Sequence, residues 1–215
     1  MKLILTKTDL VLGIVVVIAA VLISSSVSLT STTTLPAAMA QDVPTCYGWP
    51  ATIIGTPGDD FLNGTAGNDV IVGLGGNDRI QAFDGFDYNC GDDGNDGMAG
   101  GAGNDIMEGG AGNDYVNGYS GDDIVNGDNG DDYPSGGEGN DQMAGGEGND
   151  FMDPGTGNDF TNGETGDDGL YGFDQVVNND SSDGGPGNDA CASDPDPTIN
   201  CEINEHQQII AEPGA

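Results

Sequence analysis

A nine-residue unit is repeated thirteen times without insertion between residues 55 and 171, and no other feature constrains the fold as strongly. The first two copies read Gly55-Thr-Pro-Gly-Asp-Asp60-Phe-Leu-Asn and Gly64-Thr-Ala-Gly-Asn-Asp69-Val-Ile-Val. The fourth position is Gly and the sixth is Asp in every copy, and the fifth is Asn or Asp in twelve. A fixed period of this kind is typical of a solenoid, in which short units stack and bury a shared core.

Each unit divides into a turn and a strand. Positions one to six are rich in Gly, Asn and Asp, which tolerate positive φ angles, and they are predicted to form the turn. Positions seven to nine are predicted to form a three-residue strand whose inward side chain, at position eight, is apolar in ten copies: Leu62, Ile71, Ile80, Met98, Met107, Val116, Val125, Met143, Met152 and Leu170. Two units would complete a coil of about eighteen residues, and coils would stack at roughly 4.8 Å. The predicted fold class is all-β, a parallel β-roll with N- and C-terminal caps.

Core packing does not explain an Asp at every sixth position, because stacked coils bring these like charges close together. A cation between them is therefore expected. Carboxylates and main-chain carbonyls from a glycine-rich turn form an oxygen cage that suits a hard ion, Ca²⁺ above all. The predicted side-chain ligands are the position-six residues Asp60, Asp69, Asp78, Asp87, Asp96, Asp105, Asp114, Asp123, Asp132, Asp141, Asp150, Asp159 and Asp168, together with Asp189 of a last copy.

Several copies resemble a known repeat. Gly100-Gly-Ala-Gly-Asn-Asp105-Ile-Met-Glu and Gly145-Gly-Glu-Gly-Asn-Asp150-Phe-Met-Asp resemble the hemolysin-type (RTX) nonapeptide Gly-Gly-x-Gly-x-Asp-x-U-x. The resemblance implies a parallel β-roll that holds multiple Ca²⁺ ions between successive turns of one edge, ligated by the Asp carboxylates and by turn carbonyls. Those carbonyls would lie near Gly55, Gly64, Gly73, Gly91, Gly100, Gly109, Gly118, Gly127, Gly136, Gly145 and Gly163. Seven loops on one edge and six on the other set an upper limit of eleven ions.

Two copies depart from the pattern in ways that affect packing. The copy at residues 82–90 carries Phe86 in the turn and Asn89 at the core position, and weaker or missing ions are expected beside it. Another copy carries Pro134 at the core position. Because proline cannot donate to a strand ladder, a bent strand is expected there.

Composition excludes several classes of function. The chain contains 39 Gly and has a formal net charge of −34, from 37 acidic and 3 basic residues. This charge opposes binding to nucleic acid, and it opposes compaction unless divalent ions offset it. A disordered acidic chain is the alternative that such a composition suggests. Disorder is the expected state without the ion, but it does not account for the nine-residue phase.

Residues 1–40 have the order of a secretory signal. Lys2 and Lys7 precede an apolar run, Leu10–Ile23, and a Ser/Thr-rich stretch leads to Ala38-Met-Ala40. The run is short for a bilayer span, but its distance from Ala40 is long for a cleavage region, so an uncleaved anchor is the alternative to a signal peptide. In either case the repeats are expected to be secreted or held at the cell surface, with membrane contact only through this segment.

The remaining segments are predicted to be caps and a loop. Residues 41–54 would form the N-terminal cap, with Ile53 at a core position and Tyr47 and Trp49 over the open end of the first coil; contact with a ligand such as a sugar is the alternative for these rings. Residues 172–183 hold no full copy and are predicted to form a surface loop. Residues 184–201 would form a last repeat and a C-terminal cap, followed by a tail at 202–215.

Four cysteines in an exported chain suggest two disulfides. Cys191 and Cys201 are ten residues apart and would close the C-terminal cap. Cys46 and Cys90 would then remain. Their spacing corresponds to roughly 12 Å along the stack of coils, which is too far for a bridge unless the N-terminal cap folds back.

No catalytic constellation emerges, and the protein is not expected to be an enzyme. His206 is the only histidine, which excludes a His-Glu-x-x-His zinc site, and Ser120 lies in a repeat turn without a Gly-x-Ser-x-Gly motif. Acidic residues that could mimic a glycosidase pair occupy periodic positions that metal binding already explains.

Two non-catalytic functions remain. The first is an exported Ca²⁺-binding roll that folds when it meets extracellular Ca²⁺, a role that the RTX resemblance implies. The second is a cell-surface adhesin or envelope scaffold that Ca²⁺ stiffens and that binds another macromolecule, which the sequence does not identify. A continuous aromatic face would favour the second, but Gly97, Gln142 and Gly169 interrupt the outward aromatic positions Phe61, Tyr88, Tyr115, Tyr133, Phe151, Phe160 and Tyr171. Ordinary strand formation is therefore the expected role of these rings.

Overall fold

The computed structural model describes residues 43–172, 180–193, 198–199 and 201. Within these ranges the chain forms nineteen strands and no helix. The proposed signal or anchor segment and the C-terminal tail lie outside the described residues. The described residues contain no apolar helix long enough to span a membrane. The first two strands, β1 (Thr45–Cys46) and β2 (Trp49–Pro50), form a short antiparallel hairpin.

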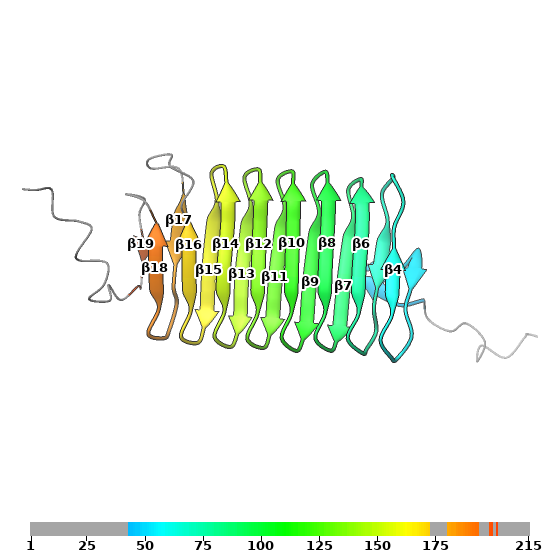
Figure 1. Ribbon diagram of the computed structural model, residues 1–215, viewed down its shortest axis with the longest axis horizontal. Coiled ribbons are helices and arrows are strands. Elements are labelled where there is room, and N and C mark those ends of the chain that lie inside the picture. The colour runs from blue at the N-terminus through cyan, green and yellow to red at the C-terminus, as the bar shows by residue number, and fades with distance from the viewer. Residues whose placement is uncertain (1–42, 173–179, 194–197, 200, 202–215) are drawn as a thin grey trace, which may run out of the picture. The chain divides into compact units, whose positions relative to one another are not determined.

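The other strands alternate along the chain between two parallel sheets (Figure 1). The eight-stranded sheet contains β4 (Phe61–Asn63), β6 (Arg79–Asp84), β8 (Gly97–Ala102), β10 (Tyr115–Ser120), β12 (Tyr133–Glu138), β14 (Phe151–Thr156), β16 (Gly169–Gly172) and β18 (Ala190–Ser193). The nine-stranded sheet contains β3 (Ile53–Ile54), β5 (Val70–Val72), β7 (Tyr88–Asp93), β9 (Ile106–Ala111), β11 (Ile124–Asn129), β13 (Gln142–Glu147), β15 (Phe160–Thr165), β17 (Ser181–Asp183) and β19 (Thr198–Ile199). Tyr115 lies opposite Gly97 and Tyr133, each eighteen residues away. The prediction of an all-β parallel β-roll with two units per coil is confirmed.

The central strands are six residues long, so the prediction of three-residue strands is wrong for them. Strand β8, for example, runs from position seven of one copy to position three of the next. The backbone at position two adopts positive φ, 122° at Gly101 and 74° at Tyr119. This conformation lies within the strand, as in a glycine bulge, and pairing resumes beyond it. The turn is therefore confined to positions four to six.

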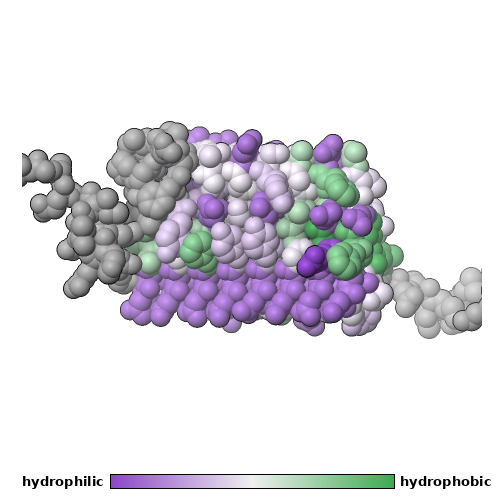
Figure 2. Space-filling model, in the orientation of Figure 1, coloured by the Kyte–Doolittle hydropathy of each residue, from purple (hydrophilic) through white to green (hydrophobic). Residues whose placement is uncertain are grey.

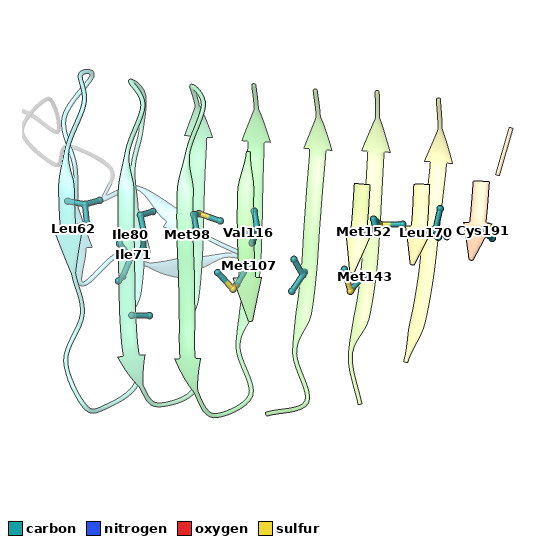
Figure 3. Close-up of a cluster of buried hydrophobic side chains, with 12 residues drawn as sticks. Leu62, Ile71, Ile80, Met98, Met107, Val116, Met143, Met152, Leu170 and Cys191 are labelled. Carbon is teal, nitrogen blue, oxygen red and sulfur yellow. The ribbon is translucent and has the colours of Figure 1, made fainter. Parts of the chain in front are cut away.

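The core is a file of position-eight side chains that come alternately from the two sheets (Figure 3). All ten residues predicted to be apolar core residues are buried, with Leu62 the most exposed at 9%. Ala82 and Cys191 join the same cluster, and Ile53 packs against it, as expected for a core position. Because each nine-residue unit contributes about one core side chain, no coil can be stable without its neighbours.

Asn89 is the exception in the core. It lies between Ile71 and Met107 in the ladder and is fully buried, and neither its side-chain oxygen nor its nitrogen has a hydrogen-bond partner. We expect Asn89→Leu to raise the free energy of unfolding by about 1–3 kcal/mol, because it removes two buried unsatisfied polar atoms. Urea unfolding in saturating Ca²⁺ measures this, with Gln142→Leu at an exposed position of the same sheet as the control. A destabilised Asn89→Leu variant would contradict the packing described here.

Pro134 disturbs the ladder only on one side. It remains opposite Val116 of β10. The pairing of β12 with β14, however, includes Ser135 and the residues after it but not Pro134. Proline has no N–H to donate. The disturbance expected at Pro134 therefore takes the form of a local loss of pairing.

Both disulfides are formed. Cys191 bonds to Cys201, as predicted, and Cys46 bonds to Cys90, with Cα atoms 5.7 Å apart in each pair. The second bridge is possible because the N-terminal hairpin folds back along the roll, where β1 contacts β5 and β7. This removes the axial separation that the residue spacing alone predicted.

The same folding back overturns one prediction about the cap. Tyr47 and Trp49 do not cover the open end of the first coil. Their rings pack on Tyr88 of β7, with centroids 6.2 and 6.1 Å away, on the outer surface of the nine-stranded sheet. The hairpin carries both rings past the first coil, and both stay about half exposed.

The segment predicted to be a loop at residues 172–183 contains part of a further copy. Ser181–Asp183 form β17 and pair with β15, at a spacing of 21 residues instead of 18. Residues 173–179 lie outside the described residues. The loop prediction is therefore wrong for residues 180–183, because a three-residue insertion hides the phase in the sequence. Asp180 nevertheless stands nine residues before Asp189, which is a signal of the repeat.

Candidate metal centre

The position-six aspartates form two columns, one along each turn edge of the roll. In each column the backbone N–H of one Asp donates to Oδ1 of the Asp in the next coil, as Asp96 does to Asp114 at 2.7 Å. One column consists of Asp60, Asp78, Asp96, Asp114, Asp132, Asp150, Asp168 and Asp189. The other consists of Asp69, Asp87, Asp105, Asp123, Asp141, Asp159 and Asp180. All predicted Asp residues thus lie in the columns, and Asp180 is a member that the sequence prediction missed.

The other carboxylate oxygen, Oδ2, is left without a hydrogen bond in most of the columns. This oxygen is buried and has no hydrogen-bond partner in ten residues: Asp78, Asp87, Asp96, Asp105, Asp114, Asp123, Asp132, Asp141, Asp150 and Asp168. A buried carboxylate oxygen that lacks a donor is costly, and the cost is reduced by protonation or by a bound cation. The columns therefore need a counterpart at Oδ2.

In nine of these ten residues, Oδ2 lies beside the glycine at position one of the same copy; the exception is Asp87, whose copy has Ala82 there. A Cβ atom built on Gly109 would stand 2.6 Å from Oδ2 of Asp114 and 2.7 Å from the carbonyl oxygen of Gly127 in the next coil. The same two kinds of oxygen, one carboxylate and one carbonyl, surround Gly55, Gly64, Gly73, Gly91, Gly100, Gly118, Gly127, Gly136, Gly145 and Gly163. Glycine keeps this cradle free of side-chain atoms. The carboxylate oxygen and the carbonyl oxygen point toward the same space, and no N–H or O–H group lies between them. Two such oxygens are suitable ligands for a hard cation.

The first aspartate of each column has a different environment. Oδ2 of Asp60 accepts hydrogen bonds from the backbone N–H and the hydroxyl of Thr56, at 2.5 and 2.8 Å. Oδ2 of Asp69 accepts the equivalent bonds from Thr65, at 2.6 and 2.9 Å. These oxygens already accept hydrogen bonds, so Oδ2 of Asp60 and Asp69 does not need a cation or a proton as the other column members do.

The position-five residues have a structural role that needs no ion. The backbone N–H of Asn95 donates to Oδ1 of Asn77 at 2.9 Å, and Asn113 donates to Asn95 at 2.8 Å. An Asn or Asp side-chain oxygen is therefore needed at each turn to accept the hydrogen bond from the backbone N–H of the next coil. These exposed turns contribute to the hydrophilic band along one edge in Figure 2. Phe86 has no such oxygen and interrupts the ladder on its edge.

Burial shifts the acidity of the columns. It raises the pKa of Asp105 and Asp114 to about 7, and that of Asp96 and Asp123 to about 6. The hydrogen bond from the backbone N–H to Oδ1 partly offsets this effect, and the charges of neighbouring aspartates add to it. Ca²⁺ and protons should therefore compete for these carboxylates.

Without Ca²⁺, the roll is expected to be more stable at pH 4.5 than at pH 8. Folded-state pKa values of about 6–7 exceed the unfolded value of about 3.9. Protonation thus favours the folded state, and this contribution is lost as pH rises through 6 to 7. Far-UV circular dichroism in EDTA at pH 8, 6 and 4.5 measures the effect, and the β signal should increase on acidification. In saturating Ca²⁺, which binds the ionised form, acidification should lower the melting temperature. A β signal in EDTA that decreases between pH 8 and pH 4.5 would contradict this account.

The cradles rely on main-chain oxygens more than on clustered side chains. Within the residues that the structure describes, no group of three or more His, Cys, Asp or Glu side chains gathers in a metal-binding arrangement. Each cradle instead combines a carboxylate with a carbonyl from the next coil, as at Asp114 and Gly127. This arrangement exists only where successive coils are stacked.

The comparison with protein families agrees with this geometry. The family model described as RTX calcium-binding nonapeptide repeat (four copies) matches residues 54–88, 64–98, 91–107, 99–134 and 135–161. Together these overlapping segments run from residue 54 to 161, half of the 215-residue chain. No individual curated protein shows significant similarity to the chain. The repeated motif, the stacked parallel coils and the family match lead to one conclusion: the chain belongs to the family of RTX calcium-binding nonapeptide repeat proteins.

Proposed function

We propose that the protein is an exported, non-catalytic β-roll that binds several Ca²⁺ ions along its turn edges and folds when extracellular Ca²⁺ is available. One observation carries the proposal: in ten of the column aspartates, the buried Oδ2 atom has no hydrogen-bond partner. In nine of these aspartates, the same oxygen lies beside a main-chain carbonyl of the next coil at a position-one glycine. Ca²⁺ supplies the positive charge that this oxygen-only environment lacks and accepts an irregular set of oxygen ligands.

The proposed ligands are the column carboxylates and the position-one carbonyls described above. Asp60 and Asp69 are the weakest candidates, because Thr56 and Thr65 already donate to their Oδ2 atoms. The Asp87 site is also weak, because Ala82 puts a methyl group at position one of that copy. With Asp180 and Asp189 included, eight carboxylates on one edge and seven on the other leave seven and six intervals, so the geometric limit rises from eleven ions to thirteen.

Folding on Ca²⁺ binding is supported by the balance of forces in the roll. A chain with a formal net charge of −34 repels itself when compact. Its core contributes about one buried side chain per nine-residue unit, and the column carboxylates resist ionisation. The hydrophobic core is therefore small relative to the charge that must be stacked. Divalent ions between the coils would neutralise that charge where it is densest.

Export is supported by the order of charged, apolar and small residues in 1–40 and by two disulfides, which persist in oxidising compartments. We propose a signal peptide or anchor at 1–40, an N-terminal cap at 41–54 and a calcium-binding roll at 55–171. Residues 184–201 would supply the last repeat and the C-terminal cap, before a tail at 202–215.

The number of bound ions tests the proposal. The full chain is stripped with EDTA, saturated with Ca²⁺, separated from free ion, and analysed for metal content. About ten Ca²⁺ per chain are expected, one for each of the ten column aspartates whose buried Oδ2 has no donor. Mg²⁺ should not compete at equal concentration, because it demands a near-ideal octahedral site and sheds water reluctantly. Two or fewer Ca²⁺ ions per chain would refute the multi-ion roll.

A second candidate function is a Ca²⁺-stiffened adhesin or envelope scaffold, and one observation favours it. Four outward rings of the eight-stranded sheet stack in series. Tyr115 and Tyr133 are 5.2 Å apart, Tyr133 and Phe151 are 5.1 Å apart, and Phe151 and Tyr171 are 4.4 Å apart. Gly169 does not interrupt this series, because Tyr171 occupies the space beside Phe151. Such a rigid aromatic surface suits contact with another macromolecule.

A further inference from the structure

A groove crosses the outer surface of the eight-stranded sheet along β8. All six residues of β8 line it, and all but the inward-pointing, buried Met98 are small: Gly97, Ala99, Gly100, Gly101 and Ala102. On either side of the groove, the neighbouring strands β6 and β10 carry large side chains. Two adjoining cavities of about 400 and 280 Å³ share Gln81, Ala99 and Tyr119, so the groove is continuous across the sheet. In Figure 2 a hydrophobic patch covers the same end of the roll.

Phe83 and Tyr119 form the walls of the larger cavity. Both lie opposite Gly101 in the ladder, one on each side of β8. Both have positive φ, 77° and 74°, and both rings are about half exposed. A bulky residue in this backbone conformation is strained. Glycine would adopt this conformation without strain, so both rings are held here at a cost in backbone strain.

Arg79 and Tyr115 form the walls of the smaller cavity. Both lie opposite Gly97. The Arg79 guanidinium lies over the ring of Phe61, 5.5 Å from its centroid. Arg79 is the only Lys or Arg after residue 7, in a chain of 37 acidic residues. Within the described residues it pairs with no carboxylate. Its charge is therefore available to a ligand in the groove.

We propose that this groove binds a carbohydrate chain that carries a carboxylated sugar. The rings of Tyr115, Tyr119 and Phe83 pack against the apolar faces of sugar rings. The Gln81 amide, at the junction of the two cavities, hydrogen-bonds sugar hydroxyls. The Arg79 guanidinium pairs with the sugar carboxylate in a two-pronged, charge-assisted contact. None of the column aspartates lines the groove.

The surroundings of the groove argue against other ligands. An extended peptide adds to a sheet through a free edge, but β8 is already paired with β6 and β10 on both sides. Nucleic acid presents a dense row of phosphates, which a chain of net charge −34 repels. Arg79 is the one cation of the groove and matches a ligand that carries an isolated carboxylate. Asp84 lines the larger cavity, away from Arg79, where its carboxylate can accept hydrogen bonds from sugar hydroxyls. An oligosaccharide with a single acidic sugar has this composition.

Glycine substitutions test the proposal without damaging the fold. The full chain, in 5 mM Ca²⁺, is applied to an immobilised panel of neutral and uronate-containing oligosaccharides. Wild type should bind uronate-containing members. The double variant Phe83→Gly/Tyr119→Gly should fold at least as well, since glycine relieves positive φ, and should bind more than about tenfold less tightly. Glu164→Gly is the control. Glu164 also has a positive φ, 69°, but lies in the nine-stranded sheet, so this variant should bind like wild type.

Arg79→Gln tests the carboxylate contact separately. It should lose about tenfold in affinity for uronate-containing members and keep its affinity for neutral ones, because only the charged pair is removed. Absence of binding to every carbohydrate, equal binding by the double glycine variant, or binding to an extended peptide panel instead would each overturn the proposal. Circular dichroism of each sample reports calcium-dependent folding independently, so failure of the groove and failure of the calcium roll are distinguishable.

Discussion

A variant with three consecutive aspartates of one column changed to asparagine, Asp96→Asn/Asp114→Asn/Asp132→Asn, is expected to need at least about 100-fold more Ca²⁺ to fold. Asparagine keeps the Oδ1 acceptor that joins the coils. It replaces the Oδ2 atom, which has no donor, by an NH₂ group, and so removes the negative charge that holds a hard cation. The same NH₂ can donate to the facing carbonyl. In EDTA, therefore, this variant should be more folded than wild type. Far-UV circular dichroism during Ca²⁺ titration measures both effects.

A matched variant separates this local effect from net charge. Asp122→Asn/Asp131→Asn/Asp167→Asn removes the same three charges from position five, where the side chains are exposed and most copies carry Asn. Its Ca²⁺ midpoint should stay within a few-fold of wild type, because it leaves both columns intact. Equal shifts in the two triple variants would show that only the overall charge matters, and would contradict the assignment of the columns.

Removal of the Cys46–Cys90 disulfide is expected to lower the free energy of unfolding by about 4 kcal/mol, because the bridge closes a long loop, 44 residues, in the unfolded chain. Alanine is used in the double variant Cys46→Ala/Cys90→Ala because serine would place a hydroxyl group at two positions that are almost fully buried. It should also loosen the N-terminal hairpin from β5 and β7. Urea unfolding in saturating Ca²⁺ gives the free energy, and amide hydrogen exchange in β5 reports the loosening.

The C-terminal bridge provides the internal comparison. Cys191→Ala/Cys201→Ala opens a loop of only ten residues and should cost less, about 3 kcal/mol. Its effect on hydrogen exchange should be confined to the C-terminal coils. A larger loss of stability for the C-terminal pair than for the N-terminal pair would contradict the role assigned to the folded-back hairpin.

The nine-residue phase was sufficient to predict the register and the core. With two units in each coil, Asp at position six and an apolar residue at position eight align between coils only in the eighteen-residue register. Leu62 through Leu170 therefore had to form one file, and the aspartates two columns. The period contains this information because each unit contacts only its neighbours in the stack.

Other features depend on geometry that the period does not contain. Positions one to three are rich in glycine and read as a turn, but their positive φ at Gly101 or Tyr119 lies inside a strand. Asp180 escaped prediction because a three-residue insertion breaks the phase before it. The chain reverses direction in the N-terminal hairpin, and this brings Cys46 to Cys90. The number of residues between the two cysteines does not reveal such a reversal. The stack that joins Tyr171 to Phe151 depends in the same way on where a ring turns in space.

The most direct test of the calcium-folded roll is a far-UV circular dichroism titration of the disulfide-bonded chain at pH 8. CaCl₂ and MgCl₂ are added separately to EDTA-stripped protein. The account predicts a cooperative gain of β signal between about 10⁻⁴ and 10⁻³ M Ca²⁺, the range of weak extracellular sites, and no gain with Mg²⁺. A full β signal already present in excess EDTA, and unchanged by Ca²⁺, would contradict folding on calcium binding and leave a metal-independent scaffold.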